Sequence, residues 1–228
     1  MAELALAPPT PGASPTASWD TLRDEPGPDA LRCLGLYTRL AAGVTVVTAL
    51  DAAGRPAGMT VSALTSVSAR PPLLLACLRS GSQTLTALKE RGEFAVSFLT
   101  DRQRGVAERF ADPALSPTAR FRGVPVRQVL GVPVVSEALA WSVCLVEDVR
   151  RYGDHDAVVG RVRAVEAGSG RPLLWHDRAF HTLTSLPRSS PPVPSPPLPS
   201  PPLPSPPLLS PPLPSLPLAS LPLRAEES

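Results

Sequence analysis

The chain has three histidines, and His155 stands where such a residue could do chemistry. It lies in YGDHDAVVGRV, residues 152–162, between a Gly-Asp turn and a strand-like run that begins at Ala157. A histidine at the mouth of a strand can donate a hydrogen bond and change charge near neutral pH. A polar turn residue between two strands would look the same, so the residues alone fit both interpretations.

RSGSQT, residues 79–84, has the composition of an anion site. It combines the guanidinium of Arg79 with the hydroxyls of Ser80, Ser82 and Thr84 at a turn that leads into a predicted helix. The first N–H groups of a helix lack partners and readily bind phosphate. The sequence therefore offers a phosphate site here.

The stretch GMTVSA, residues 58–63, offers a surface for a flat ligand. Thr60 and Ser62 share one face of a predicted strand, and the small residues Gly58 and Ala63 let a ring approach closely. These residues and the turn after them equally fit a half-exposed strand followed by a helix N-cap.

Common catalytic signatures are missing from the sequence. It contains no GxGxxG after a strand, no GxxxxGK[ST] loop, no HExxH and no GxSxG. The usual dinucleotide and NTPase folds are therefore excluded at the level of motifs. His176 and His181 flank Asp177, but one alternating strand would place residues five apart on opposite faces, so we expect no metal site there.

The elements that must position these residues are mostly strands. Helical spacing occurs in 29–41, ended by Gly43; in 82–92, ended by Gly92; and in 101–111, with Asp101 as the expected N-cap. Strand patterns cover residues 44–50, 59–68, 71–78, 93–99, 138–150, 156–168 and 171–183. Many strands with short helices favour a mainly β fold, a small closed or nearly closed antiparallel barrel.

Composition divides the chain into three parts. Residues 1–28 are rich in Pro and Ala and are predicted to be a flexible leader, whereas 29–186 have globular periodicities. Residues 187–228 repeat PPLPS, and because proline fixes φ and lacks an N–H, we expect a disordered tail with polyproline II character. This tail could dock on an aromatic-lined groove such as those of SH3-type modules, or be a low-complexity extension without a partner.

Net charge and cysteine content limit the classes of partner and the cellular compartment that we expect. A net charge of +2 gives no basic field for nucleic acid, and no run of about 20 apolar residues would span a membrane. Cys33, Cys77 and Cys144 are odd in number and far apart, which indicates buried free thiols rather than disulfides. With Glu3 and prolines at the start there is no signal-peptide pattern, so we expect a cytoplasmic protein without nucleic-acid or membrane partners.

Several separated motifs occur in a fixed order, and together they resemble those of a known family. The motifs are LAAGVTVVTA, GMTVSALTSVSARPPLLLACLRSGSQTLTAL, GEFAVSFL, ERFA, YGDHDAVVGRV and PLLWHDRAF. They resemble the flavin reductase family, which has the FMN-binding split-barrel fold, and more narrowly the reductase components of two-component flavin-dependent monooxygenases. The resemblance covers residues 29–186 and neither end.

This resemblance implies a function and a site. It implies a Greek-key-like split β-barrel and an NAD(P)H:flavin oxidoreductase that reduces FMN or FAD with NADH or NADPH and supplies the reduced flavin to a partner monooxygenase. The family's site lies at a subunit interface, which implies a homodimer. His155, preceded by Asp154, would sit beside the flavin and contact the nicotinamide. Flavin contacts carry over to Thr60, Val61, Ser62, Ala63, Cys77, Leu78, Arg79, Ser82 and Thr84.

The sequence also departs from the family, and rival interpretations stay open. Relatives often carry an Arg-Gly-Arg-Tyr-like run in the last segment, whereas HDRAF here puts Phe180 at the aromatic position, without a hydroxyl. Residues 113–134 are expected to form a loop over the site, from which Arg120, Phe121 and Arg122 could touch flavin or nucleotide. The alternatives are a flavin- or haem-binding barrel without turnover and an interaction protein that works through its proline-rich tail.

Overall fold

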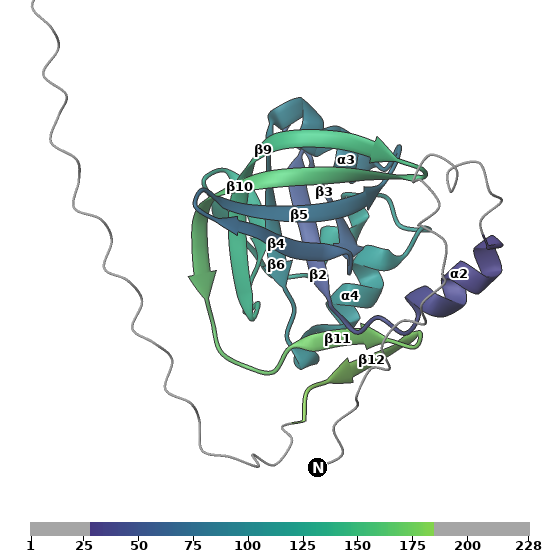
Figure 1. Cartoon of the computed structure of the whole chain (residues 1–228). Helices are drawn as coiled ribbons and strands as arrows, with labels where there is room; N and C mark the ends of the chain where they lie inside the picture. The colour runs from purple at the N-terminus through teal and green to yellow at the C-terminus, as the bar shows by residue number, and fades with distance from the viewer. Residues whose placement is uncertain (1–27, 185–228) are drawn as a thin grey trace, which may run out of the picture. The chain divides into compact units, whose positions relative to one another are not determined.

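The computed structural model describes residues 28–184 (Figure 1). The predicted tail at 187–228 and all but the last residue of the predicted leader at 1–28 lie outside the described residues. The predicted domain boundaries therefore stay predictions.

Seven antiparallel strands form the main sheet, in the order β3-β2-β6-β9-β10-β5-β4 (Figure 1). The two edge strands, β3 and β4, follow one another in the chain and are joined only by Ser62 and Ala63. Because the first and last strands of the sheet are adjacent in sequence, the sheet must curl back on itself. The predicted mainly β antiparallel barrel is confirmed, and its seam lies at Ser62–Ala63. The strands are β2 Thr45–Leu50, β3 Pro56–Val61, β4 Leu64–Ala69, β5 Pro72–Arg79, β6 Glu93–Phe98, β9 Ala140–Tyr152 and β10 His155–Ala167.

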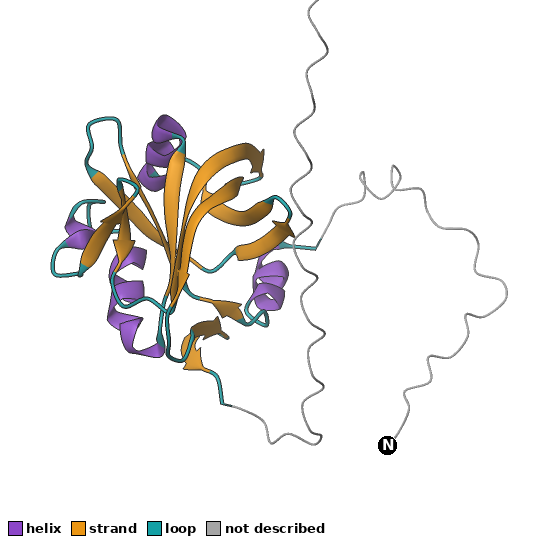
Figure 2. Ribbon diagram, turned by 90° about the vertical axis from the view of Figure 1, so that its left-hand side faces the viewer, coloured by secondary structure: helices purple, strands orange, loops and turns teal. Residues whose placement is uncertain are grey.

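Strand β2 is buried on both faces because a different helix covers each one. Val47 packs in one apolar cluster with Leu85 of helix α3 (Gln83–Arg91). Its neighbour Val46 points the other way, into a second cluster with Phe110 of helix α4 (Arg104–Ala111). The two helices therefore pack against opposite faces of β2. Figure 2 shows the helices and the strands of this part of the chain in a second view.

Smaller elements complete the described part of the chain. Strands β1 (Ala42–Gly43), β11 (Leu173–His176) and β12 (Ala179–Thr182) form a three-stranded sheet. A separate hairpin joins β7 (Val126–Val129) to β8 (Val132–Val135). The remaining helices are α2 (Ala30–Tyr37) and the 3-10 turns η1 (Asp101–Gln103) and η2 (Ala119–Phe121).

Some predicted boundaries are wrong for local reasons. The first helix ends at Tyr37 instead of running toward Gly43, which lies in β1, and none of its residues is buried. The N-cap before η1 is Thr100, whose backbone and hydroxyl pair with Gln103, and not Asp101. Residues 59–68, read as one strand, divide at the seam into β3 and β4.

Residues 171–183 form a hairpin rather than the single strand expected. Asp177 and Arg178 adopt φ of 47° and 60°, which reverses the chain between β11 and β12. The argument that separates His176 from His181 is therefore wrong, since their ring centroids are 5.8 Å apart. The segment 113–134 is also not all loop, because it contains β7 and the start of β8.

The three cysteines are free thiols, but only Cys144 is buried, while Cys33 and Cys77 are partly exposed. Within residues 28–184 no helix is long and apolar enough to cross a membrane. The same residues contain no group of three or more His, Cys, Asp or Glu side chains placed to hold a metal ion.

Candidate functional site

The seam of the barrel presents the end of β3 to a large cavity. Thr60 lines this cavity, and its hydroxyl donates to the Ala107 carbonyl of α4 at 2.6 Å. Val61 turns its side chain into the core, and its carbonyl accepts from the Thr45 hydroxyl at 2.6 Å. Beyond it the strand breaks off, and the Ala63 carbonyl accepts the amide of Cys77 at 2.9 Å.

Residues 79–84 form the predicted turn into a helix. Ser82 is the N-cap of α3, with its hydroxyl oxygen accepting from the Leu85 amide at 3.3 Å. The tight turn before it depends on Gly81, whose φ of 74° favours glycine. The Ser82 amide donates to the Arg79 carbonyl at 3.1 Å. Ser82, Gln83 and Thr84 at this helix start all line the cavity, and the unpaired N–H groups of a first helical turn are able to bind an anion.

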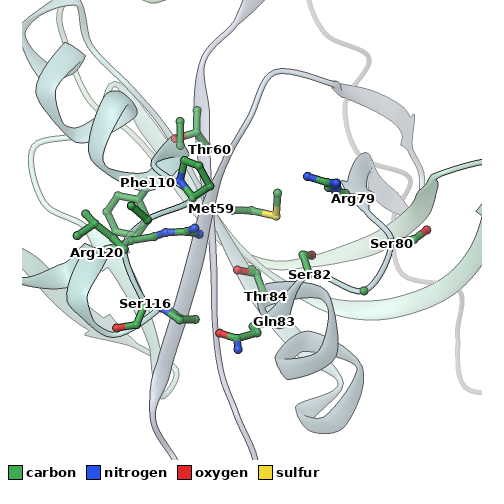
Figure 3. A pocket seen from close by; sticks show the side chains of 16 residues that line it. Met59, Thr60, Arg79, Ser80, Ser82, Gln83, Thr84, Phe110, Ser116 and Arg120 are labelled. Atoms are coloured by element: carbon green, nitrogen blue, oxygen red, sulfur yellow. The ribbon is translucent and has the colours of Figure 1, made fainter.

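The cavity between these two stretches has a volume of about 830 Å³ (Figure 3). This volume is typical of a pocket for a cofactor or drug-sized ligand, for which about 300–1,000 Å³ is usual. Arg79 and Arg120 approach it from opposite sides (Figure 3). The lining residues come from β3, the turn, α3, the end of α4 and the loop that follows it: Met59, Thr60, Arg79–Thr84, Phe110, Ala111, Pro113–Pro117 and Arg120.

The structure brings some of the predicted site residues together and separates others. Thr60, Arg79, Ser82 and Thr84 line the cavity. Val61 and Leu78 are buried in the core, so only their backbone could meet a ligand, while Cys77 is half-buried and Ala63 exposed. Ser62 lines a neighbouring hollow of about 380 Å³ that shares Thr60 and Ala111 with the cavity. The rings of Trp175 and Phe180, which meet edge to face with centroids 4.9 Å apart, form a wall of this hollow.

Asp154 and His155 are not among the residues that line the cavity. His155 begins β10 directly opposite Arg79 of β5, so it lies one strand away from a lining residue. Its Nδ1 pairs with a carboxylate oxygen of Asp154 at 2.9 Å, and this hydrogen bond lowers the pKa of Asp154. Because the carboxylate can only accept, Nδ1 carries the hydrogen of this bond.

Arg120 is a site residue that the sequence left undecided. Its guanidinium donates to the carbonyls of Gly58 and Asp112, both at 2.9 Å, and ties the loop after α4 to strand β3. Its Nε is buried without a partner among the described residues. The sequence carried no signal for this contact, because Gly58 lies 62 positions earlier and no regular element joins the two. Arg122 is not among the lining residues.

Gly58 has a different role from the one its sequence context indicated. A Cβ at this position would lie 2.7 Å from Cε1 of Phe110 and 3.1 Å from Cζ of Phe121. The room it leaves is therefore filled by the protein's own aromatic rings, and not left for a ligand. Phe121 packs edge-on against Phe110, with ring centroids 4.9 Å apart, and takes part in the site in this indirect way.

The buried carboxylate of Asp156 holds the turn at residues 79–84 in place. Asp156 is only 6% exposed and accepts from the Ser80 hydroxyl and, at 2.9 Å, from Nζ of Lys89 on α3. The Ser80 amide adds a bond to the Asp154 carbonyl at 2.9 Å. The hydrogen bond from Ser80, followed by that from Lys89, lowers the pKa of Asp156, so the group is held ionised.

The arrangement suits the binding and alignment of a ligand that carries a phosphate and a flat ring system more than it suits covalent catalysis. The cavity offers two guanidinium groups, a helix N-terminus and hydroxyls, and it opens into a hollow with an aromatic wall. A flavin nucleotide fits this donor set, because it combines a flat ring system with a phosphate.

Comparison with known proteins adds independent findings. The family described as "Flavin reductase like domain" matches residues 37–184. A "Probable flavin reductase" of Rhizobium meliloti is 42% identical over 61% of this chain, which spans only 43% of that protein's length. "NADH:riboflavin 5'-phosphate oxidoreductase" of Streptomyces pristinaespiralis is 39% identical over 74% of this chain and 96% of its own. The structure of the styrene monooxygenase flavin reductase from Pseudomonas putida S12 superposes with a TM-score of 0.62 at 29% identity, covering 69% of this chain and 99% of that one.

Proposed function

Because the chain belongs to the family of flavin reductase-like domains, we propose that it is an NAD(P)H:flavin oxidoreductase. It would oxidise NADH or NADPH, reduce FMN or FAD, and release the reduced flavin to a partner monooxygenase. The observation that carries this proposal is the cavity at the barrel seam, where Met59 and Thr60 of β3 lie across from the turn of Arg79–Thr84 at the start of α3.

The chain's own groups would bind and orient the flavin. Arg79, Ser82 and the free amides at the start of α3 suit its phosphate. The ring system would lie along the seam, against Thr60 and Ser62, within reach of backbone groups of Val61, Ala63, Cys77 and Leu78. Flavin supplies the hydride acceptor, so the protein's task is to exclude water and align two rings at near contact.

We propose that His155 orients the nicotinamide. Asp154 accepts from Nδ1, so Nε2 of the neutral ring can accept from a carboxamide N–H, and it can donate when the ring is protonated. Half of the His155 side chain is exposed, so an incoming nucleotide can reach it. Its role would be positioning, because hydride transfer requires no protein base.

A homodimer, a monooxygenase partner and a cytoplasmic location belong to this proposal as well. Helix α2 exposes apolar side chains, and a stripe of this kind is typical of a surface that another chain covers. Leu34, the least exposed of them, is 49% exposed, and the others are Leu31, Leu36 and Tyr37. The styrene monooxygenase reductase supports the partner, and the cytoplasmic location stays a prediction.

A direct test mixes the protein with each of the four donor and acceptor pairs. Loss of the reduced-nicotinamide absorbance under air is followed with NADH or NADPH and with FMN or FAD. Flavin-dependent oxidation well above the enzyme-free rate is expected for at least one pair. Flavin binding without oxidation by any pair would instead favour the binding protein without turnover.

A further inference from the structure

The flavin cavity continues along helix α3 into a second hollow of about 530 Å³. The two share Gln83, Ser116 and Pro117 as lining residues. Gln83 and Ser116 lie at the same end of the cavity (Figure 3). A ligand anchored at the start of α3 can therefore extend past Gln83 without leaving the groove.

The second hollow differs from the cavity in charge. Its ionisable side chains are Asp51, Glu90 and Arg55, and the only cation among them is already paired with Asp51 at 2.8 Å. Glu90 accepts the Ala52 amide with one oxygen at 3.0 Å, and its second oxygen can take a further donor. Such a hollow repels phosphate and favours a neutral group that carries hydroxyl or amino donors.

The remaining walls suit a flat apolar face. They are built from small side chains, namely Ala53, Pro56, Ala57, Ala87 and Pro117. From Ser82 to Glu90 the helix rises roughly 12 Å at 1.5 Å per residue. A phosphate held at the start of α3 therefore places a linked ribose and base in reach of Glu90.

We propose that this second hollow binds the adenosine half of FAD, so that FAD rather than FMN is the preferred flavin. The inference rests on the proposed reductase function. The isoalloxazine lies at the seam, the diphosphate at the cationic start of α3, and the adenosine between α3 and the loops 51–57 and 116–118. Glu90 accepts from the ribose hydroxyls, as acidic residues do in dinucleotide sites. FMN ends at its phosphate and leaves the hollow to water.

Thr86→Trp tests the proposal, because Thr86 is exposed on α3 and lines the hollow but not the cavity. The apparent affinity for FAD, FMN and riboflavin is measured by titration of flavin fluorescence and by KM in the oxidation assay. The parent is expected to bind FAD about tenfold or more tightly than FMN, a difference of about 1.4 kcal/mol or more. The tryptophan should remove this preference and leave the FMN affinity within about twofold. Gln128→Trp, an exposed position on β7 outside the groove, is the matched control and should change neither flavin.

Glu90→Gln gives a second reading that does not depend on the bulk of tryptophan. It should weaken FAD about threefold or more and leave FMN unchanged, because only FAD reaches the carboxylate. Equal affinities of the parent for FAD and FMN, or equal losses for both in Thr86→Trp, would overturn the adenosine site while the reductase stands. If the folded parent neither binds nor reduces any of the three flavins, the proposed function fails instead.

Discussion

Gly58→Ala is expected to destabilise the fold and to disturb the cavity through Phe110. The added Cβ would lie 2.7 and 3.0 Å from two carbons of the Phe110 ring and 3.1 Å from Phe121. Phe110 of α4 is fully buried, so its ring cannot move aside without shifting its neighbours. Overpacking of this kind costs about 1–3 kcal/mol of unfolding free energy. At about 2–4 °C per kcal/mol for a domain of this size, Tm should fall by roughly 2–12 °C.

The measurement is thermal unfolding of the parent, Gly58→Ala and a glycine-to-alanine control on helix α4. Gly105→Ala lies on α4 with nothing within 4 Å of its new Cβ, and it should raise stability by about 0.5–1 kcal/mol through helix propensity. Flavin KM should rise in Gly58→Ala only, because the Gly58 carbonyl accepts from Arg120 and the clash displaces this contact.

A smaller side chain at position 110 should relieve the clash with the added Cβ. The double variant Gly58→Ala/Phe110→Leu is expected to lose less stability than the sum of its two single variants, because the clash disappears with the ring. If Gly58→Ala keeps the parent's Tm yet loses flavin binding, the glycine makes room for the flavin itself, and the packing argument is refuted.

Three further predictions concern side chains near the site. His155→Ala should raise KM for the nicotinamide nucleotide or lower kcat, with flavin affinity within about twofold; unchanged kinetics would remove His155 from the site. Arg120→Met should raise flavin KM about tenfold by freeing the loop from β3 and removing a cation, and an unchanged KM would leave Arg120 a purely structural role. The pKa of Asp156 is lower in the folded than in the unfolded chain, so its contribution to stability is present above the unfolded carboxyl pKa of about 3.9 and is lost as pH falls through the folded value. Asp156→Asn should therefore lower Tm at neutral pH, and its Tm should approach that of the parent in acid; a Tm difference that does not change with pH would show that the ionised form is not what stabilises the fold.

Features encoded by neighbouring residues could be predicted from the sequence. Helix α3 begins after Ser82, which caps it, and ends at Gly92 with φ of 71°, as the spacing and the glycine indicate. The turn at residues 79–84 is predictable for the same reason, since its parts lie within six residues. The turn between β11 and β12 could not be predicted, because Asp177 and Arg178 adopt a left-handed conformation that favours glycine.

Features that depend on distant residues could not be predicted in this way. The hydrogen bond from Arg120 to Gly58 and the filling of Gly58 by Phe110 both join α4 and its loop to β3, and no periodicity reports which loop folds over which strand. Helix α2 is shorter than its apolar spacing predicts: it ends at Tyr37, and none of its residues is buried within the described part of the chain.

The run Asp154-His155-Asp156 shows how one short stretch can serve two parts of a site. Alternate residues of a strand point to opposite faces, so the second aspartate turns inward while the histidine before it stays exposed. Asp156 then binds the Ser80 hydroxyl and the Asp154 carbonyl binds the Ser80 amide. The turn proposed for the flavin phosphate is thereby hydrogen-bonded to Asp154 and Asp156, the two residues that flank the histidine proposed for the nicotinamide. Because ring alignment sets the rate of hydride transfer, a rigid link between the two binding groups is what this reaction needs from the protein.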